Sequence, residues 1–204
     1  MEVIQNNNTA PQGENLSVWS YFVRCITKKY SDFSGRARRK EWWSFALFEL
    51  LITSLLSIPM GMTFGEEFAA DPEIAQYMAQ NPGDMEYVYS LLGSNVFFWA
   101  LTIVGILLLV PTLAVGCRRF HDVGLSTGLF WVVGGLSVLS TIISLLMVIA
   151  PGVIPQALTG IVSFLSMLAG LAMLVVAFIP GKTGPNAYGP DPKPAPTYEG
   201  YGQI

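Results

Sequence analysis

The chain has 204 residues, of which 52% are hydrophobic and 12% are charged. Soluble domains carry about 25% charged residues, so the composition excludes an ordinary soluble domain and predicts one integral membrane bundle. The net charge of −3 conceals an asymmetry, because the eleven Lys and Arg residues occur in three short patches with none between Lys40 and Arg118.

The N-terminal region divides into a polar tail and an amphipathic segment. Residues 1–16 have no apolar run and no basic start, so we expect a disordered tail and no cleavable signal peptide. Residues 17–31 have polar and apolar positions at helical spacing, with Ser17 suited to be the N-cap. Basic residues on one face and aromatic residues on the other predict a helix in the membrane interface. The alternative is a helix that packs on a soluble partner.

The first membrane span is predicted at about residues 42–62. It follows a basic stretch that ends at Lys40, and it begins with Trp42 and Trp43, a pattern typical of a cytoplasmic boundary. Residues 63–94 are polar and acidic and predict an external loop. Within this loop, residues 71–73 (Asp-Pro-Glu) are typical of a helix N-terminus, and we expect a short helix to about residue 80.

Three further spans are predicted at about residues 95–117, 128–150 and 157–179. The helix of the second span should contain a kink at Pro111 and continue to a C-cap at Gly124. Ser126 or Thr127 can cap the third span. The expected fold is therefore an all-α bundle of four transmembrane helices. It comprises a membrane domain over residues 17–192 and a flexible C-terminal tail over residues 193–204.

The positions of the basic residues predict the orientation of the bundle. With four spans, all eleven Lys and Arg residues fall on one side of the membrane. The positive-inside rule then places both termini in the cytoplasm. Cys25 and Cys117 lie beside basic patches on this side, where thiols stay reduced, so we expect no disulfide.

Three sequence motifs lie next to the predicted spans. The first is Phe33-x-Gly-Arg-x-x-Arg-x-x-Trp42, the second is Cys117-Arg-Arg-Phe-His-Asp-x-Gly-x-Ser126, and the third is Gly181-x-x-Gly-x-Asn-x-Tyr-Gly189. In this order, over roughly residues 18–192, they resemble the YhaH-type family of bacterial inner-membrane proteins, a family of unknown function. Phe120 stands where that family more often has Leu. The resemblance implies a bacterial inner membrane location and brings no activity, substrate or cofactor.

The second motif ends a long apolar run in polar residues and is the centre of the candidate site. Arginine carries a planar fork of donors that suits phosphate and carboxylate, and basic pockets between spans can hold anionic head groups. We therefore expect an anion or head-group site, and its candidate residues are Arg36, Arg39, Arg118, Arg119, His121 and Asp122. The alternative is that these charges fix topology and pair internally with Asp32, Glu41 and Asp122.

Metal and nucleophile chemistry have little support in this motif. The chain has one histidine, so a histidine-rich metal site is excluded by counting, and we expect no cofactor. Cys117 and His121 are four residues apart and could form a nucleophile pair, but a buried cysteine beside a capping histidine is the simpler interpretation.

Two further groups of residues are candidates for the site. Glu49 is a charge inside the first span and should find a buried partner, for which we hypothesise the arginine–histidine motif. Asn186 and Tyr188 could fold the start of the tail over the same face. The favoured interpretation is a non-enzymatic inner-membrane protein that binds lipids, with no nucleic-acid partner. A second copy or another membrane protein is an open possibility as partner. The alternatives are a proton-linked transporter that uses Glu49 and His121, and a membrane enzyme that acts on lipid head groups.

Overall fold

The computed structural model describes residues 15–193, except for the side chains of residues 67–69. The expected disorder of residues 1–14 and 194–204 concerns segments outside the described residues. Within the described part there are seven helices, and the β structure consists of an isolated bridge between Asn186 and Gly189. Four helices are long and apolar enough to cross a membrane, so the prediction of an all-α four-span bundle is confirmed.

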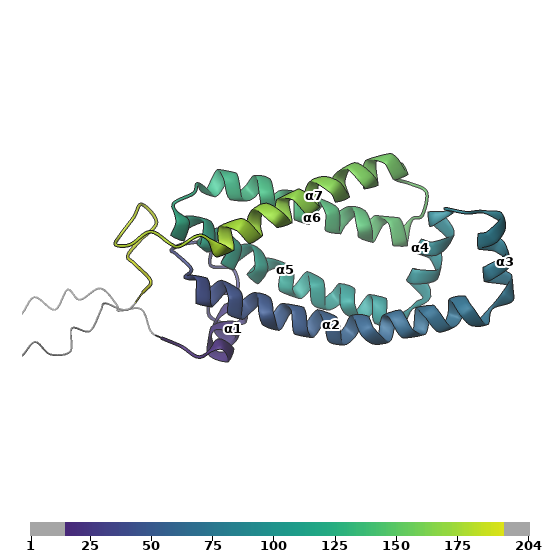
Figure 1. Ribbon diagram of the computed structural model, residues 1–204, viewed down its shortest axis with the longest axis horizontal. Coiled ribbons are helices and arrows are strands. Elements are labelled where there is room, and N and C mark those ends of the chain that lie inside the picture. Colours follow the sequence, from purple (N-terminus) through teal and green to yellow (C-terminus); the bar gives the residue numbers. More distant parts are fainter. Residues whose placement is uncertain (1–14, 194–204) are drawn as a thin grey trace, which may run out of the picture.

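The four long helices run side by side, with the short helices at the two ends (Figure 1). α2 packs mainly along α5, α6 packs mainly along α7, and α5 also contacts α6 and α7. The helices in chain order are α1 (Val18–Ile26), α2 (Arg39–Ala70), α3 (Pro72–Gln80), α4 (Met85–Ser94), α5 (Val96–Val123), α6 (Thr127–Ile149) and α7 (Gln156–Phe178).

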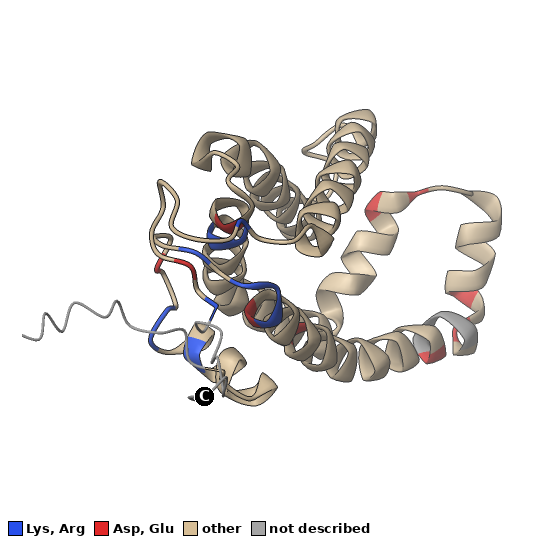
Figure 2. Cartoon of the chain, turned by 60° about the vertical axis from the view of Figure 1, so that its left-hand side comes forward, with Lys and Arg blue, Asp and Glu red and all other residues tan. Residues whose placement is uncertain are grey.

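The two ends of the bundle differ in charge (Figure 2). We call the end formed by α1, the start of α2, the end of α5 and the loops at residues 27–38, 124–126 and 179–193 the basic end, because all eleven Lys and Arg residues lie there. The opposite end, with the last turns of α2, α3 and α4, carries only acidic charges and is called the acidic end.

α2 is longer than the sequence predicted. The expected span ended near residue 62, but the helix continues to Ala70, which gives 32 residues and a length of about 48 Å. A bilayer core needs only about 30 Å, so the last turns of α2 extend past it at the acidic end. Pro59 lies inside the helix, and no further proline follows it until Pro72, which disfavours helical geometry at Asp71.

The other helix ends follow the local capping signals. Ser17 accepts a hydrogen bond from Ser20 N, Asp71 caps α3 ahead of Pro72, and Ser126 caps α6. Gly124 ends α5 with a φ of 85°, in the left-handed region that favours glycine. α1 ends at Ile26, five residues earlier than expected, where Thr27 forms its C-cap.

α1 lies against the basic end of α2 and α5. Phe22 and Cys25 of α1 are buried in one cluster with Phe45 of α2 and Val115 of α5. Trp19, one turn before Phe22 on α1, packs against the Phe22 and Phe48 rings and is still 57% exposed. One face of this short helix therefore belongs to the core, and an aromatic residue suited to a membrane interface lies at the edge of that face.

A hydroxyl group satisfies the backbone at Pro111, inside α5. Proline has no N–H, so the carbonyl of Leu107, four residues earlier, loses its helical partner. The hydroxyl of Tyr30, which follows α1, donates to this carbonyl at 2.7 Å. This bond ties the segment after α1 to the middle of a spanning helix.

We expect Tyr30→Phe to lower the free energy of unfolding by about 1–3 kcal/mol, because it leaves the Leu107 carbonyl unsatisfied in apolar surroundings. Unfolding by SDS in mixed micelles, followed by circular dichroism, measures this change. In a Pro111→Ala background the restored N–H can bond to Leu107, so the same substitution should cost less than half as much there. Equal costs in the two backgrounds would contradict this role for Tyr30.

Candidate functional site

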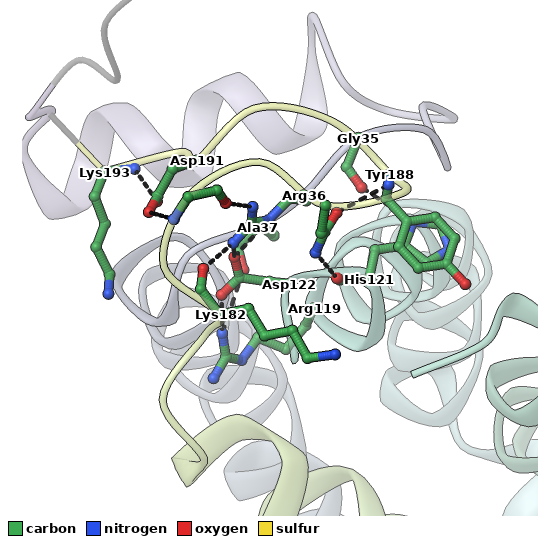
Figure 3. A network of polar contacts seen from close by, with 12 residues as sticks. Gly35, Arg36, Ala37, Arg119, His121, Asp122, Lys182, Tyr188, Asp191 and Lys193 are labelled. Atoms are coloured by element: carbon green, nitrogen blue, oxygen red, sulfur yellow. Dashed lines mark hydrogen bonds and ion pairs between the residues drawn. The ribbon is translucent and has the colours of Figure 1, made fainter. Parts of the chain in front are cut away.

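The carboxylate of Asp122 holds two buried arginines at the basic end (Figure 3). One oxygen lies 2.5 Å from Nη1 of Arg119, one turn earlier on α5, and the other lies 3.1 Å from Nε and Nη2 of Arg36 in the loop before α2. Arg119 is 0% exposed and Asp122 is 2% exposed. Two positive charges thus share one negative charge away from water.

The same two guanidinium groups bind the backbone at the end of α7 and just after it. Arg119 donates to the carbonyls of Ala177 and Ile179, and Arg36 donates to those of Lys182 and Gly184, the last at 2.6 Å. These carbonyls include α7 C-terminal groups that the helix itself leaves unpaired. The arginines therefore fix the start of the tail against the ends of α5 and α7.

Close backbone contact completes this attachment. Lys182 N donates to the carbonyl of Asp122 at 2.9 Å, and Ala37 N donates to that of Arg118 at 2.9 Å. A Cβ at Gly181 would lie 1.9 Å from Oδ2 of Asp122, so only glycine fits there. The end of α5 is thus clamped between the loop before α2 and the segment after α7.

Arg118 forms a second buried pair, with Glu41 of α2. Nη1 lies 3.0 Å from Oε1, and Lys29 Nζ lies 3.8 Å from the same oxygen. Burial lowers the pKa of Lys29, against the opposing effect of Glu41. Cys25 Sγ lies 3.8 Å from Glu41 and 3.9 Å from Arg118. Burial, with the Glu41 charge, raises the pKa of Cys25 to about 11, so this thiol is a poor nucleophile near neutral pH.

His121 is fully engaged within the protein. Nδ1 lies 3.0 Å from the carbonyl of Gly35, which can only accept, so this nitrogen carries the proton. Nε2 lies 2.8 Å from the Thr127 hydroxyl and 3.6 Å from Cys117 Sγ. Tyr188 stacks on the imidazole with a centroid distance of 3.9 Å and an interplanar angle of 3°. These contacts make His121 a bridge between loops.

The tail motif meets the same helix end. The side chain of Asn186 donates to the carbonyl of His121 at 2.9 Å and accepts from Tyr188 N at 2.8 Å. Asp191 accepts from Gly184 N at 2.9 Å and from Lys193 N at 3.0 Å. Partial burial would raise the pKa of Asp191, but these backbone donors outweigh it and lower that pKa. Asn186 and Tyr188 thus order the tail over the end of α5.

The structure corrects the pairing hypothesised for Glu49. Its carboxyl group lies 2.8 Å from the Thr112 hydroxyl of α5, whereas Glu41 is the residue that holds Arg118. Glu49 is eight residues, or about 12 Å along the helix axis, from Glu41. Glu49 lies too deep in the bundle for this pairing, because the arginines stay at the end of the bundle, where the loops provide carbonyl partners.

The candidate anion-binding residues fall into two groups. The first group is buried and pairs with acidic residues of the protein, as the alternative to an anion site predicted; it comprises Arg36, Arg118 and Arg119. The second group is exposed and includes Arg39. Outside the motif, a groove of ≈ 670 Å³ runs along the polar face of α1. Its charged lining residues are Arg24, Lys28, Lys29 and Asp32.

Sequence reasoning missed several residues of this region. Tyr30 could have been found from the carbonyl that Pro111 leaves unpaired, and Gly181 stood in the third motif. Thr112 carried no signal, since threonine often bonds its own helix backbone, as it does here to Leu108.

We expect Asp122→Asn to destabilise the protein by about 3–5 kcal/mol, because it leaves two buried arginines without a negative partner. SDS unfolding measures this cost. Limited trypsin digestion at Lys182 reports separately on release of the tail, which should be cleaved faster.

The matched control for this change is Asp191→Asn, which alters the same chemical group in the tail, where the carboxylate accepts backbone N–H groups rather than arginines. Its cost should be about 1 kcal/mol. If Asp122→Asn cost no more than Asp191→Asn, the shared carboxylate would not be what secures this end.

Comparisons with known proteins agree with the membrane architecture. The family model described as "Protein of unknown function (DUF805)" matches residues 30–190. The chain is 26% identical over 171 residues to Inner membrane protein YhaH of Escherichia coli K12, covering 84% of this chain and 95% of that protein. It is 22% identical over 168 residues to Inner membrane protein YhaI of the same organism, covering 82% and 92%. No solved structure matches.

Proposed function

This chain belongs to the DUF805 family of membrane proteins of unknown function, and we propose that it is a non-enzymatic protein that binds anionic lipid head groups at its basic end. The relatives are inner membrane proteins, and the four apolar helices fit a multi-pass protein of the bacterial inner membrane. In this proposal both termini lie in the cytoplasm. The groove along α1 is the observation that carries it.

Charge asymmetry supports the orientation. All eleven basic residues lie at one end of the bundle, and the opposite end has acidic charges only. Short connections rich in Lys and Arg stay on the cytoplasmic side of a bacterial membrane. The cytoplasmic leaflet also contains anionic lipids, so the basic end would face the surface that attracts it most.

The groove combines positive charge with an interfacial anchor. Arg24, Lys28 and Lys29 line it together with Trp19, and Asp32 is its acidic member. Lys28 is exposed, and so is Trp19 in the first turn of α1. A helix with this arrangement lies at head-group level, where phosphate groups are close to its basic side chains.

The buried arginines support the surface rather than contact the ligand. Arg118 and Glu41 lie directly under α1, with Lys29 as the third charge. Glu41 thereby attracts Lys29 toward the core and keeps one edge of the groove in place. The neighbouring loops are held by ion pairs and hydrogen bonds from four other buried residues, which are Arg36, Arg119, His121 and Asp122.

We expect Arg24→Gln with Lys28→Gln to weaken binding of phosphatidylglycerol by about 2 kcal/mol, or roughly 30-fold, since each basic residue near an anionic surface contributes about 1 kcal/mol. Native mass spectrometry of protein released from mixed phosphatidylglycerol and phosphatidylethanolamine nanodiscs measures the lipids retained.

The control is Lys182→Gln with Lys193→Gln, which removes the same charge from exposed tail positions outside the groove. This variant should retain phosphatidylglycerol as the wild type does. Equal retention by all three proteins would show that the groove is not a head-group site.

We expect green fluorescent protein fused after Ile204 to be fluorescent, because it folds in the cytoplasm. Alkaline phosphatase fused at the same position should be inactive, because it needs an oxidising compartment. The reverse pattern would place the basic end outside and overturn the orientation.

A further inference from the structure

A second candidate site lies inside the bundle, beginning next to the basic end and reaching deeper than its ion pairs. A cavity of ≈ 200 Å³ opens where all four long helices meet. Its lining residues from α2 and α5 include Trp42, Phe45, Ala46, Glu49, Thr112 and Gly116. Those from α6 and α7 include Phe130, Gly134, Ser137, Ala169, Gly170 and Met173.

Small residues and aromatic rings shape this cavity. The Phe130 ring lies 3.0 Å from the position that a Cβ would take at Gly116 and 3.2 Å from the one at Gly134. At Gly170 nothing lies within 4 Å of such a Cβ, so that wall is open. The space is large enough for a small ligand, because an apolar cavity of about 150 Å³ can hold benzene.

Glu49 is the only ionisable residue among those that line the cavity. Its hydrogen-bond partner among the described residues is the Thr112 hydroxyl at 2.8 Å, which also lies 2.7 Å from the carbonyl of Leu108. A hydroxyl has one proton, so an ionised Glu49 and the Leu108 carbonyl must share it. The ionised carboxylate consequently receives at most part of one hydrogen bond in an apolar space.

Such a carboxyl group is costly unless something else compensates it. Placing a carboxylate within a span costs about 2.5–3.5 kcal/mol at the helix centre, and charged residues there normally pair with a partner. The arginines of the second motif do not provide one, because Glu41 and Asp122 hold them at the basic end. When it is ionised, Glu49 therefore has no positive partner among the described residues.

We propose that this cavity binds a small hydrophobic ammonium cation, with Glu49 as its counter-charge. The Trp42, Phe45 and Phe130 rings supply apolar contact and can attract a cation through their faces. Ser137 and Thr112 are the other polar side chains in the lining, so the cavity favours a cation with apolar substituents over a hydrated one. This site is independent of the head-group groove, which has the opposite charge preference.

Isothermal titration calorimetry with benzyltrimethylammonium tests the proposal, using the full chain in phosphatidylcholine nanodiscs and empty nanodiscs as reference. We expect saturable binding by the wild type. Neopentylbenzene has the same shape with carbon in place of nitrogen, so it separates charge from apolar contact. It should bind at least about tenfold more weakly, because a desolvated charge pair is lost.

Two variants and one control locate the binding. Glu49→Gln keeps the side-chain shape and should reduce affinity for the cation at least about tenfold, leaving that for neopentylbenzene unchanged. Ala46→Leu, one turn earlier on α2, fills the cavity and should abolish binding of both compounds. Glu66→Gln makes the same charge change on the exposed end of α2 and should bind the cation as the wild type does.

The outcomes decide the proposal. No saturable binding by the wild type, equal binding of the two compounds, or unchanged cation affinity in Glu49→Gln would each overturn it. If Glu49→Gln does not yield folded protein, Ala46→Leu and the comparison of the two compounds still decide, because neither alters the carboxyl group.

Discussion

The ion pairs of Asp122 with Arg36 and Arg119 are the interaction on which the structure of the basic end depends. Buried charges are tolerated only when they are paired and their remaining donors are satisfied. Here two arginines share one carboxylate, and their Nη groups also donate to backbone carbonyls at the end of α7 and after it, although Nε of Arg119 has no hydrogen-bond partner. The requirement to satisfy these donors places two chain segments that are distant in sequence, the loop before α2 and the segment after α7, against the end of α5. Gly181 follows from the same constraint, since no larger residue leaves room for the carboxylate.

Pairing at this end also decides which charges remain for function. Glu41 and Asp122 together engage Arg36, Arg118, Arg119 and Lys29, so two acids face four bases. The excess positive charge stays at one end of the bundle, next to the exposed bases of α1 and the tail. The polar cluster thus has a structural role and an electrostatic one: it holds the loops and keeps this end basic.

The sequence predicted the architecture because membrane spans and caps are local signals. Apolar runs of about 20 residues, the Trp pair at residues 42–43 and Gly124 each mark a boundary without reference to the rest of the chain. The polar site was harder to predict from the sequence, because it depends on pairing between residues that are distant in the chain. The sequence left open whether the arginines bind a ligand or pair internally, and it assigned Glu49 to a cluster that is formed by Glu41. Residues on one helix face cannot be ordered by depth until the loops that supply their partners are placed.

The separation of Glu41 from Glu49 explains how one helix face can serve two chemistries. Glu41 lies at the end of the bundle, where Arg118 and Lys29 compensate it. Glu49, about 12 Å deeper, faces Thr112 and an apolar cavity. Had the arginines reached that depth, Glu49 would be neutralised internally and the cavity would have no charge to offer. Because Asp122 and the backbone carbonyls at and after the end of α7 retain Arg36 and Arg119 at the basic end, the attachment of the tail and the availability of Glu49 have the same physical cause.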